Sequence, residues 1–406
     1  MRLRIHHGAT EIGGNCIELE SGDETLLLDL GLPLDGDNSD LPSVAGLRTE
    51  RRGLLGVILS HPHLDHYGLL PHADPSMPVW LGEGALRLLD AAAPFVGSAF
   101  PQIATPYRDR EPFEVGPFRI TPYLMDHSAY DAHALLVEAC GRRLLYTGDF
   151  RGHGRKQLVF ERFLADPPRN IDLLLMEGTT LGRDAEVITE SDVEDEIRRT
   201  MADTPGIVLV CLAGQNIDRL VGLFRASLRA GRTLIVDVYT ACLVDGLGLD
   251  SLPDMATHQA IRIYLPRSQR RRIIAGRRFD LVDRYRSRRI FMPEIAADST
   301  RFTMLVRSSM INELKPLTLT GGALIWSLWP GYLERDRTDL RRWAEVNGLA
   351  FHLIHASGHA HHGDLKRMAE RLAPARLMPI HTRHPERYRA LYPKVEILPN
   401  GSWGAV

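Results

Sequence analysis

Short apolar runs separated by glycine, proline and aspartate make up most of the chain between Arg2 and Asp149. Runs of this length between turn residues are typical of β-strands. A pattern with the period of a helix is found between Gly84 and Ala93. We therefore predict a region rich in β-structure, with strands at residues 25–29, 57–60, 134–138 and 143–146.

The pattern changes near residue 190, where the chain becomes polar and helical. The sequence Ser191-Asp-Val-Glu194 fits a capped helix start, because the side chains of Ser191 and Glu194 can each accept a hydrogen bond from the other's backbone N–H. A strand, a helix and a second strand follow, and units of this kind hold parallel strands. The predicted elements lie at residues 206–211, 216–230 and 232–237, with further strands at 303–306 and 322–326.

From Phe351 the character of the first region returns, with a short strand into His355, a helix at 364–372 and a strand that ends at His381. No internal repeat or low-complexity linker separates the regions. A chain of 406 residues is long for a single core, so two domains are expected. The order of elements indicates an α/β fold in which one α/β domain is inserted into another.

Composition and cysteine usage are those of an ordinary globular protein. Hydrophobic residues make up 44% and charged residues 25%, and no stretch approaches the roughly 18 apolar residues of a membrane span. The N-terminal residues alternate as in an edge strand and lack the apolar core of a signal peptide. The four dispersed cysteines predict free, buried thiols. We expect a cytoplasmic protein without membrane contacts; a homodimer is left open.

The positive charge is concentrated in one stretch. The formal net charge is −2, but the arginine-rich sequence between Arg262 and Arg289 contains only Asp280 and Asp283 as acidic residues. Such a local excess suits a polyanion, although a solvated helix face in an arginine-rich protein would have the same composition. The candidate nucleic-acid contacts are Arg270, Arg271, Arg272, Arg277 and Arg278.

The hexapeptide His61-Pro62-His63-Leu64-Asp65-His66 carries four potential metal ligands directly after the apolar run 54–59. Such a run predicts a buried strand, and its end would present the ligands. Side chains two residues apart on a strand point the same way, so His61 and His63 are expected to face one side. The hexapeptide therefore predicts a loop that holds two cations, rather than a chance gathering of surface histidines.

Two later positions extend this cluster. Asp126-His127 follows the apolar run 119–125, again at the end of a predicted strand. Asp149 follows Tyr146-Thr-Gly, also after a strand. Either position alone would suit a hydrogen-bonded core residue, but together with the hexapeptide they favour a metal centre.

These motifs resemble those of the metallo-β-lactamase superfamily, and in particular its nucleic-acid-processing β-CASP branch. Residues 28–31 resemble the first superfamily motif, whose Asp29 would brace the metal loop, and the hexapeptide resembles the second motif. The third and fourth motifs would be supplied by His127 and Asp149. Three later segments resemble motifs of the β-CASP branch. Met176-Glu177-Gly-Thr-Thr180 resembles its acidic motif, His355-Ala-Ser-Gly-His359-Ala resembles the histidine-containing segment of ribonuclease J, and Pro379-Ile-His381 resembles the closing histidine motif.

The resemblance implies an αββα metallo-β-lactamase sandwich with an inserted α/β β-CASP domain. The first domain would comprise residues 1–190 and 347–406, and the insert residues 191–346. One metal ion would be held by His61, His63 and His127, the other by Asp65, His66 and His381, and Asp149 would bridge both. Imidazole and carboxylate ligands suit two Zn²⁺ ions, with Mn²⁺ as the alternative.

The resemblance also implies a reaction. A hydroxide between the two metals would attack a phosphodiester, with Asp65 within the catalytic centre. His359 would act as general acid, and Glu177 would hold its ring and favour the protonated form. Phosphate groups of the substrate would contact His355, Ser357, Ser308 and Ser309.

Two departures from the ribonuclease J pattern affect the expected activity. The chain ends soon after His381, where ribonuclease J continues into a long extension. Residues 307–310, Arg-Ser-Ser-Met, stand where that family has a glycine-rich phosphate-contacting segment. These differences make exonuclease action less secure than phosphodiester hydrolysis.

The leading hypothesis is a zinc-dependent ribonuclease acting on single-stranded RNA that passes between the two domains. RNA is favoured over DNA because the last motif carries His381, where DNA-directed relatives tend to have an apolar residue. The alternatives are a DNA nuclease of repair or defence, a small-molecule metallo-hydrolase, and a non-catalytic RNA-binding subunit. The large insert argues against a small substrate, and the complete ligand set argues against a non-catalytic subunit.

Overall fold

The computed structural model describes residues 1–34, 40–48, 53–96, 104–183, 186–336 and 338–406. These residues form two compact units. Unit 1 contains the described residues of 1–89, 98–187 and 358–406, and unit 2 contains those of 90–97 and 188–357. Helix α2 begins in unit 1 and ends in unit 2. The chain therefore leaves unit 1, builds most of unit 2, and returns.

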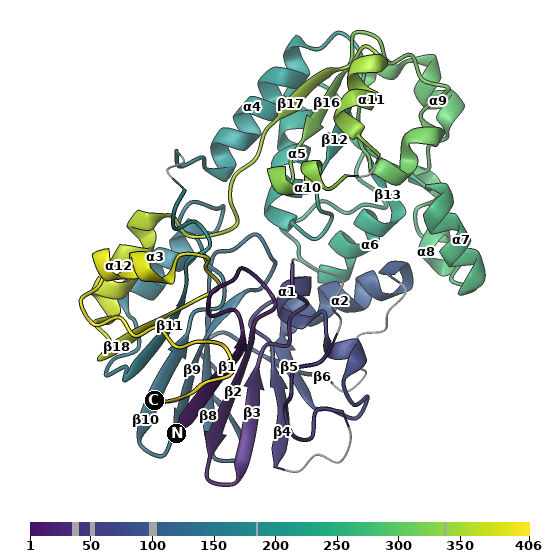
Figure 1. Ribbon diagram of the computed structural model, residues 1–406. Helices are drawn as coiled ribbons and strands as arrows, with labels where there is room; N and C mark the ends of the chain where they lie inside the picture. Colours follow the sequence, from purple (N-terminus) through teal and green to yellow (C-terminus); the bar gives the residue numbers. More distant parts are fainter. Residues whose placement is uncertain (35–39, 49–52, 97–103, 184–185, 337) are drawn as a thin grey trace. The chain divides into compact units, whose positions relative to one another are not determined.

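The first sheet of unit 1 joins the start and the end of the chain (Figure 1). Its strands have the order β19-β1-β2-β3-β4-β5-β6. Pairing is antiparallel from β19 to β3 and parallel from β3 to β6. The bounds are Trp403–Ala405, Arg2–His7, Cys16–Ser21, Glu24–Leu28, Leu54–Ile58, Val79–Gly82 and Ala104–Tyr107.

The second sheet of unit 1 has the order β18-β11-β10-β9-β8-β7. Strands β10, β11 and β18 are parallel to one another, so their carboxyl ends lie at the same edge of the sheet. The remaining pairs are antiparallel. The bounds are Arg376–Ile380, Leu173–Glu177, Arg142–Tyr146, His133–Ala139, Phe118–Leu124 and Phe113–Val115.

The two sheets pack face to face through their alternating apolar side chains. Leu19 and Leu28 of the first sheet share a buried cluster with Val137 and Leu175 of the second. Helices α3 and α12 cover the outer face of the second sheet, and α2 packs on the first. Unit 1 is therefore an αββα sandwich. Its helices are α1 Leu64–Tyr67, η1 Leu70–His72, α2 Glu83–Val96, α3 Gln157–Ala165, α12 His362–Leu372 and η5 Pro385–Ala390.

Unit 2 is built on a sheet whose strands are all parallel. Their order is β14-β13-β15-β12-β16-β17. Parallel sheets are covered by helices on both faces, and separate buried clusters lie on the two faces here. The strand bounds are Ile261–Tyr264, Thr233–Asp237, Phe302–Leu305, Val208–Cys211, Ala323–Trp326 and Ala350–Leu353.

The helices of unit 2 divide between these two faces. Helices α4, α5, α6 and α7 contribute to one buried cluster, and α9 and α11 to the other. None of the helices in the described ranges is long and apolar enough to cross a membrane. Their bounds are α4 Glu190–Asp203, α5 Ile217–Arg229, α6 Val238–Leu247, α7 Arg267–Ala275, α8 Asp280–Asp283, η2 Arg286–Arg288, α9 Met292–Ala297, η3 Ser299–Arg301, η4 Ser308–Glu313, α10 Pro330–Glu334 and α11 Leu340–Val346.

The predicted fold class, an α/β sandwich with an inserted domain, is confirmed. The β-CASP character of the insert and the domain limits stay predictions. The sheet of unit 2 continues past Val346, the predicted end of the insert, because β17 pairs with β16. The four cysteines are free, and all but Cys140 are buried.

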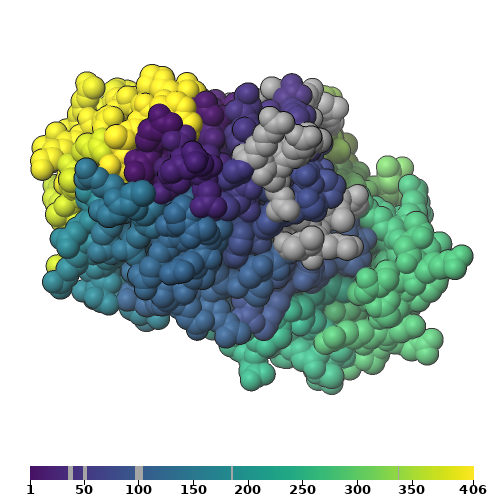
Figure 2. Space-filling model, turned by 90° about the horizontal axis from the view of Figure 1, so that it is seen from below, coloured from purple at the N-terminus to yellow at the C-terminus, as the bar shows by residue number. Residues whose placement is uncertain are grey.

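Two local predictions are wrong. Strand β1 does not lie at an edge, because residues 403–405 of β19 pair with its outer side. The two ends of the chain therefore lie side by side on one face of unit 1 (Figure 2). Helix α4 starts earlier than predicted, because Thr189 rather than Ser191 caps it. The Thr189 hydroxyl accepts from the Asp192 backbone N–H, and the Asp192 carboxylate accepts from the Thr189 backbone N–H.

A buried arginine holds the segments of unit 2 together at the amino end of the sheet. The Arg232 guanidinium donates to the carbonyls of Met201 (3.1 Å), Gly206 (2.9 Å) and Thr300 (2.9 Å). It also donates to the carbonyls of Thr204 and Phe302. One side chain thus satisfies five carbonyls from two segments, residues 201–206 and 300–302.

We predict that Arg232→Met lowers the free energy of unfolding by about 3 kcal/mol, because buried carbonyls lose charge-assisted partners. Urea denaturation followed by circular dichroism measures this change. The matched control is Arg225→Met on the exposed side of α5, which should change the free energy by no more than about 0.5 kcal/mol. Equal effects of the two substitutions would contradict the structural role of Arg232.

Candidate metal centre

The hexapeptide lies where β4 leaves the first sheet. Strand β4 ends at Ile58, and α1 starts at Leu64 with His63 as its N-cap residue. His61 and His66 are completely buried. The short helix turns the chain back, so residues 61 to 66 present their side chains to one volume instead of continuing along the strand.

Asp29 braces this loop. It follows β3 with a positive φ of 58°, and its Oδ1 accepts from the Ser60 N–H at 2.7 Å. Its Oδ2 lies 2.7 Å from His66 Nδ1 and accepts from the Tyr146 hydroxyl at 2.7 Å. Because Nδ1 of His66 faces Asp29, Nε2 is the ring atom directed toward Asp149. A ligand histidine is commonly fixed by a carboxylate in this way.

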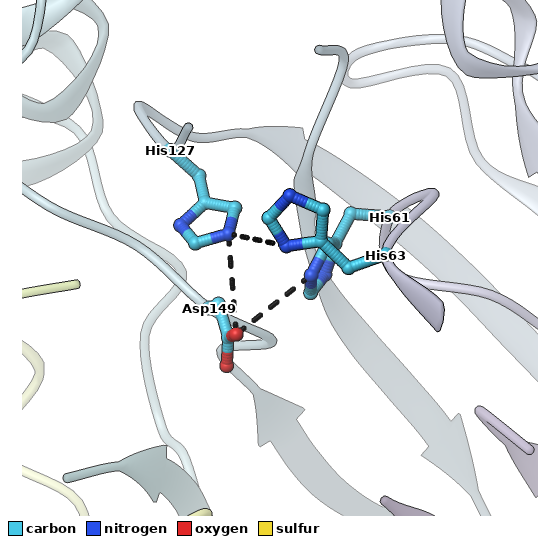
Figure 3. Close-up of side chains that lie close together, drawn as sticks. All are labelled: His61, His63, His127 and Asp149. Carbon is cyan, nitrogen blue, oxygen red and sulfur yellow. Dashed lines mark hydrogen bonds and ion pairs between the residues drawn. The ribbon is translucent and has the colours of Figure 1, made fainter. Parts of the chain in front are cut away.

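One group that could hold a metal consists of His61, His63, His127 and Asp149 (Figure 3). Their ligand atoms all lie within 4.8 Å of one another. Asp149 Oδ2 is 3.7 Å from His61 Nε2 and 3.9 Å from His127 Nε2. His127 Nδ1 lies 2.5 Å from the Gly358 carbonyl, which leaves Nε2 directed at the group.

A second group consists of Asp65, His66, Asp149 and His381. Asp149 Oδ2 is 3.2 Å from His66 Nε2, and Asp65 Oδ2 is 3.3 Å from His381 Nε2. His381 follows β18 with a positive φ of 54°, and its Nδ1 lies 2.7 Å from Thr179 Oγ1. Asp149 belongs to both groups, so a single carboxylate connects them.

The donor atoms fit bound cations. His61 Nε2, His66 Nε2 and both carboxylate oxygens of Asp149 are buried and have no hydrogen-bond partner among the described residues. Buried polar atoms without partners are costly, and a cation between them would remove that cost. Six imidazole or carboxylate side chains besides Asp149, without a thiolate, form the donor set of zinc and related divalent metals.

The protonation of the first group also suits a cation. Burial, reinforced by the neighbouring His66, lowers the pKa of His61 well below its usual value. Burial and then the charge of His63 lower the pKa of His127. Neutral imidazoles are the metal-binding form. These two rings are therefore prepared to coordinate near neutral pH.

A third group joins Asp149 and His381 to Glu177 and His359. His359 Nδ1 lies 3.4 Å from Glu177 Oε1 and 3.6 Å from Asp149 Oδ2. Burial disfavours the charged ring, but the carboxylates of Glu177 and Asp149 outweigh it and raise the pKa of His359 to about 9. The Glu177 carboxylate is itself fixed, because it accepts from the backbone N–H groups of Phe150, Thr179 and Ala360.

The other predicted substrate residues belong to unit 2, whereas the metal groups belong to unit 1. Arg219 Nη1 lies 3.5 Å from His355 Nδ1. Ser308 and Ser309 begin η4, directly after β15. Their role as phosphate contacts, and that of Ser357, stays a prediction. The predicted nucleic-acid contacts Arg270, Arg271, Arg272, Arg277 and Arg278 are all exposed.

Several residues that support the centre were not found from the sequence. Thr179 holds His381, and the Gly358 carbonyl holds His127. Both lie inside recognised motifs, so their position was a usable signal. Asn15 donates to the Tyr146 hydroxyl at 2.9 Å. No local pattern connects residues 131 positions apart, so this contact could only be found in the structure.

Comparison with known proteins agrees with this geometry. Residues 27–212 match the beta-lactamase superfamily domain. Ribonuclease J of Sinorhizobium meliloti is 25% identical over 364 residues, which cover 86% of this chain and 62% of that protein. Ribonuclease J of Mycobacterium tuberculosis is 24% identical over 408 residues, which cover 94% of this chain and 68% of that protein. The chain thus spans less than two thirds of the S. meliloti protein.

A solved structure shares the complete fold. The crystal structure of a protein of unknown function from Enterococcus faecalis V583 superimposes with a TM-score of 0.81 at 21% identity. The match covers 100% of this chain and 99% of that one. The matched domain and the two ligand groups together indicate a divalent-metal centre.

We predict that Asp29→Asn weakens metal affinity about 10- to 100-fold, because the amide no longer accepts the proton of His66 as a carboxylate does. Asparagine tolerates the positive φ of this position, so the fold should persist. Competition with a chromophoric chelator measures the affinity. The control Asp23→Asn, at an exposed turn, should leave it unchanged; a loss of affinity in both variants would refute the bracing role of Asp29.

Proposed function

Because the chain contains a beta-lactamase superfamily domain and is similar to ribonuclease J over most of its length, we propose that it is a metal-dependent ribonuclease. It would hydrolyse phosphodiester bonds of single-stranded RNA. The observation that carries the proposal is the position of Asp149, whose carboxylate belongs to both ligand groups and also contacts His359. A proton donor thus stands beside a centre suited to two cations.

The ligand residues divide between two ions. His61, His63 and His127 would hold one ion, and Asp65, His66 and His381 the other, with Asp149 serving both. When bound, two cations supply a nucleophile from water near neutral pH and offset charge on a phosphate. Zinc is the proposed metal, because imidazole ligands suit it, and manganese is the alternative, because it accepts the carboxylate ligands of the same set.

The protein's own contribution to the chemistry is the pair Glu177 and His359. Hydrolysis leaves one ribose oxygen that needs a proton, and His359 would donate it. The Glu177 carboxylate orients the ring through Nδ1. Its three backbone donors prevent it from rotating away. Asp65 would keep its carboxylate directed at His381 and the second ion.

The proposal is tested by incubating purified protein and Zn²⁺ or Mn²⁺ with end-labelled RNA and with DNA of matched sequence. We expect RNA cleavage, and we expect the Asp65→Ala/His66→Ala variant to lose at least about 10³-fold in rate. Equal activity of that variant would contradict the metal mechanism. Cleavage of DNA alone would assign a DNA nuclease, and turnover of a lactone or thioester with inert nucleic acids would assign a small-molecule hydrolase.

The general-acid role has a separate test. We predict that His359→Ala lowers kcat about 10²- to 10⁴-fold, while the metal content measured by mass spectrometry is unchanged. The matched control is His362→Ala, an exposed histidine three positions along the chain, which should retain wild-type kcat. With an RNA substrate whose leaving group needs no proton, the His359→Ala variant should regain much of the lost kcat. Absence of that recovery would argue for a structural role.

A further inference from the structure

One stretch of unit 2 carries exposed arginines that lack acidic partners among the described residues. Residues 262–289 contain eleven arginines and two aspartates. Within this stretch Arg278 pairs with Asp280 at 3.0 Å, and Arg284 pairs with Asp245 at 2.9 Å. Six further arginines are exposed and have no carboxylate partner in the described part of the chain; we call them the arginine face. They are Arg267, Arg270, Arg271, Arg272, Arg277 and Arg286.

Surface arginines elsewhere in the structure are commonly paired. Arg108 contacts Glu83 at 2.6 Å, Arg162 contacts Asp109 at 2.5 Å, and Arg367 contacts Glu161 at 2.7 Å. The arginine face departs from this pattern. Uncompensated cations repel one another, and the free energy of that repulsion is recovered when an anion binds.

The scaffold beneath the arginine face is fixed. On the inner side of α7, Ile273 is buried in the core of the unit and Gln269 Nε2 donates to Asp237 Oδ2 at 2.8 Å. The side-chain oxygen Oε1 of Gln269 accepts from the Tyr239 backbone N–H at 3.1 Å. Tyr285 is buried, and its hydroxyl donates to Asp245 at 2.9 Å. The four arginines of α7 therefore project from a helix that is held in place before any ligand arrives.

Exposed apolar side chains lie in the same stretch. Ile274, at the end of α7, is 52% exposed, and Phe279, directly before α8, is 54% exposed. The ring of Phe291 is also exposed but is covered by the Arg289 guanidinium at 5.0 Å. Phe279 has no aromatic or cationic contact among the described residues. An exposed ring two residues from the unpaired Arg277 is a group on which an unpaired base can stack.

We propose that the arginine face and Phe279 bind single-stranded RNA, with arginines on the phosphates and Phe279 stacked on a base. The choice of RNA rests on the proposed ribonuclease function. The exposed ring favours single strands over a duplex, because paired bases offer no free faces. A membrane is disfavoured, because a membrane-surface helix buries its apolar face in the lipid, whereas Ile273 of α7 is already buried in the core of the unit.

The experiment measures binding of full-length, metal-loaded protein to a labelled phosphorothioate oligouridine of about 20 nucleotides, which resists hydrolysis and covers one or two binding sites. The test variant is Arg270→Ala/Arg271→Ala/Arg272→Ala. The matched control, Arg199→Ala/Arg341→Ala/Arg342→Ala, removes the same charge from other exposed positions of unit 2.

We expect the test variant to raise Kd at least about tenfold and to lower the salt slope of log K by about 2, since each phosphate contact on a single strand contributes roughly 0.7. The control should change Kd by less than about twofold. Phe279→Ala should raise Kd about tenfold for oligouridine, and should leave binding to duplex RNA unchanged. On a cleavable RNA the test variant should raise KM and retain kcat.

Equal Kd values for the test and control variants would overturn the proposal. Tighter, arginine-face-dependent binding to phosphatidylserine vesicles than to RNA would overturn it as well, by assigning a membrane surface. Hydrolysis of bis(p-nitrophenyl) phosphate separates this proposal from the ribonuclease function. If wild type cleaves RNA and this small diester while the test variant binds RNA normally, only the arginine face fails. If wild type binds RNA through the face and cleaves neither substrate, only the ribonuclease function fails.

Discussion

A buried carboxylate at the end of β10 sets the conditions that the rest of unit 1 meets. Asp149 has almost no exposed surface, and its two oxygens have no hydrogen-bond donors among the described residues. Burying a carboxylate without compensation costs several kcal/mol. The surrounding imidazoles lower the pKa of Asp149 despite its burial, and bound cations would complete the compensation. The sandwich is thus arranged around a buried negative charge that the surrounding imidazoles stabilise in part and bound cations would stabilise further.

The topology explains how residues far apart in the sequence reach this charge. Strands β10, β11 and β18 are parallel, so Asp149, Glu177 and His381 leave the second sheet at the same edge. The first sheet contributes the hexapeptide after β4. The Tyr146 hydroxyl, at the end of β10, donates to Asp29, at the end of β3. This bond ties the two sheets directly beneath the ligands, so the spacing of the sandwich also fixes the spacing of the two groups.

The sequence reveals this site well because its information is local. Each ligand follows an apolar run, and strand ends are where side chains become available to a ligand. The errors concern contacts whose partners are distant. Nothing in residues 2–7 shows that residues 403–405 will cover their outer side. The N-cap of α4 lies two residues before the predicted one. Thr189 and Ser191 can both cap a helix, but Asp192 forms the capping box with Thr189. The bond from Asn15 to Tyr146 likewise depends on how the sheets pack.

The two units carry interactions of different range. The contacts around Asp149 act over a few ångströms in a largely buried site, so salt hardly weakens them. The arginine face acts through charges in water, where attraction extends about 10 Å and falls with ionic strength. A net charge of −2 hides this division, because acidic residues elsewhere balance the arginines of residues 262–289. RNA affinity and the rate of the chemical step can therefore change independently, since the arginine face and Phe279 share no residue with the metal ligands or with the pair Glu177 and His359.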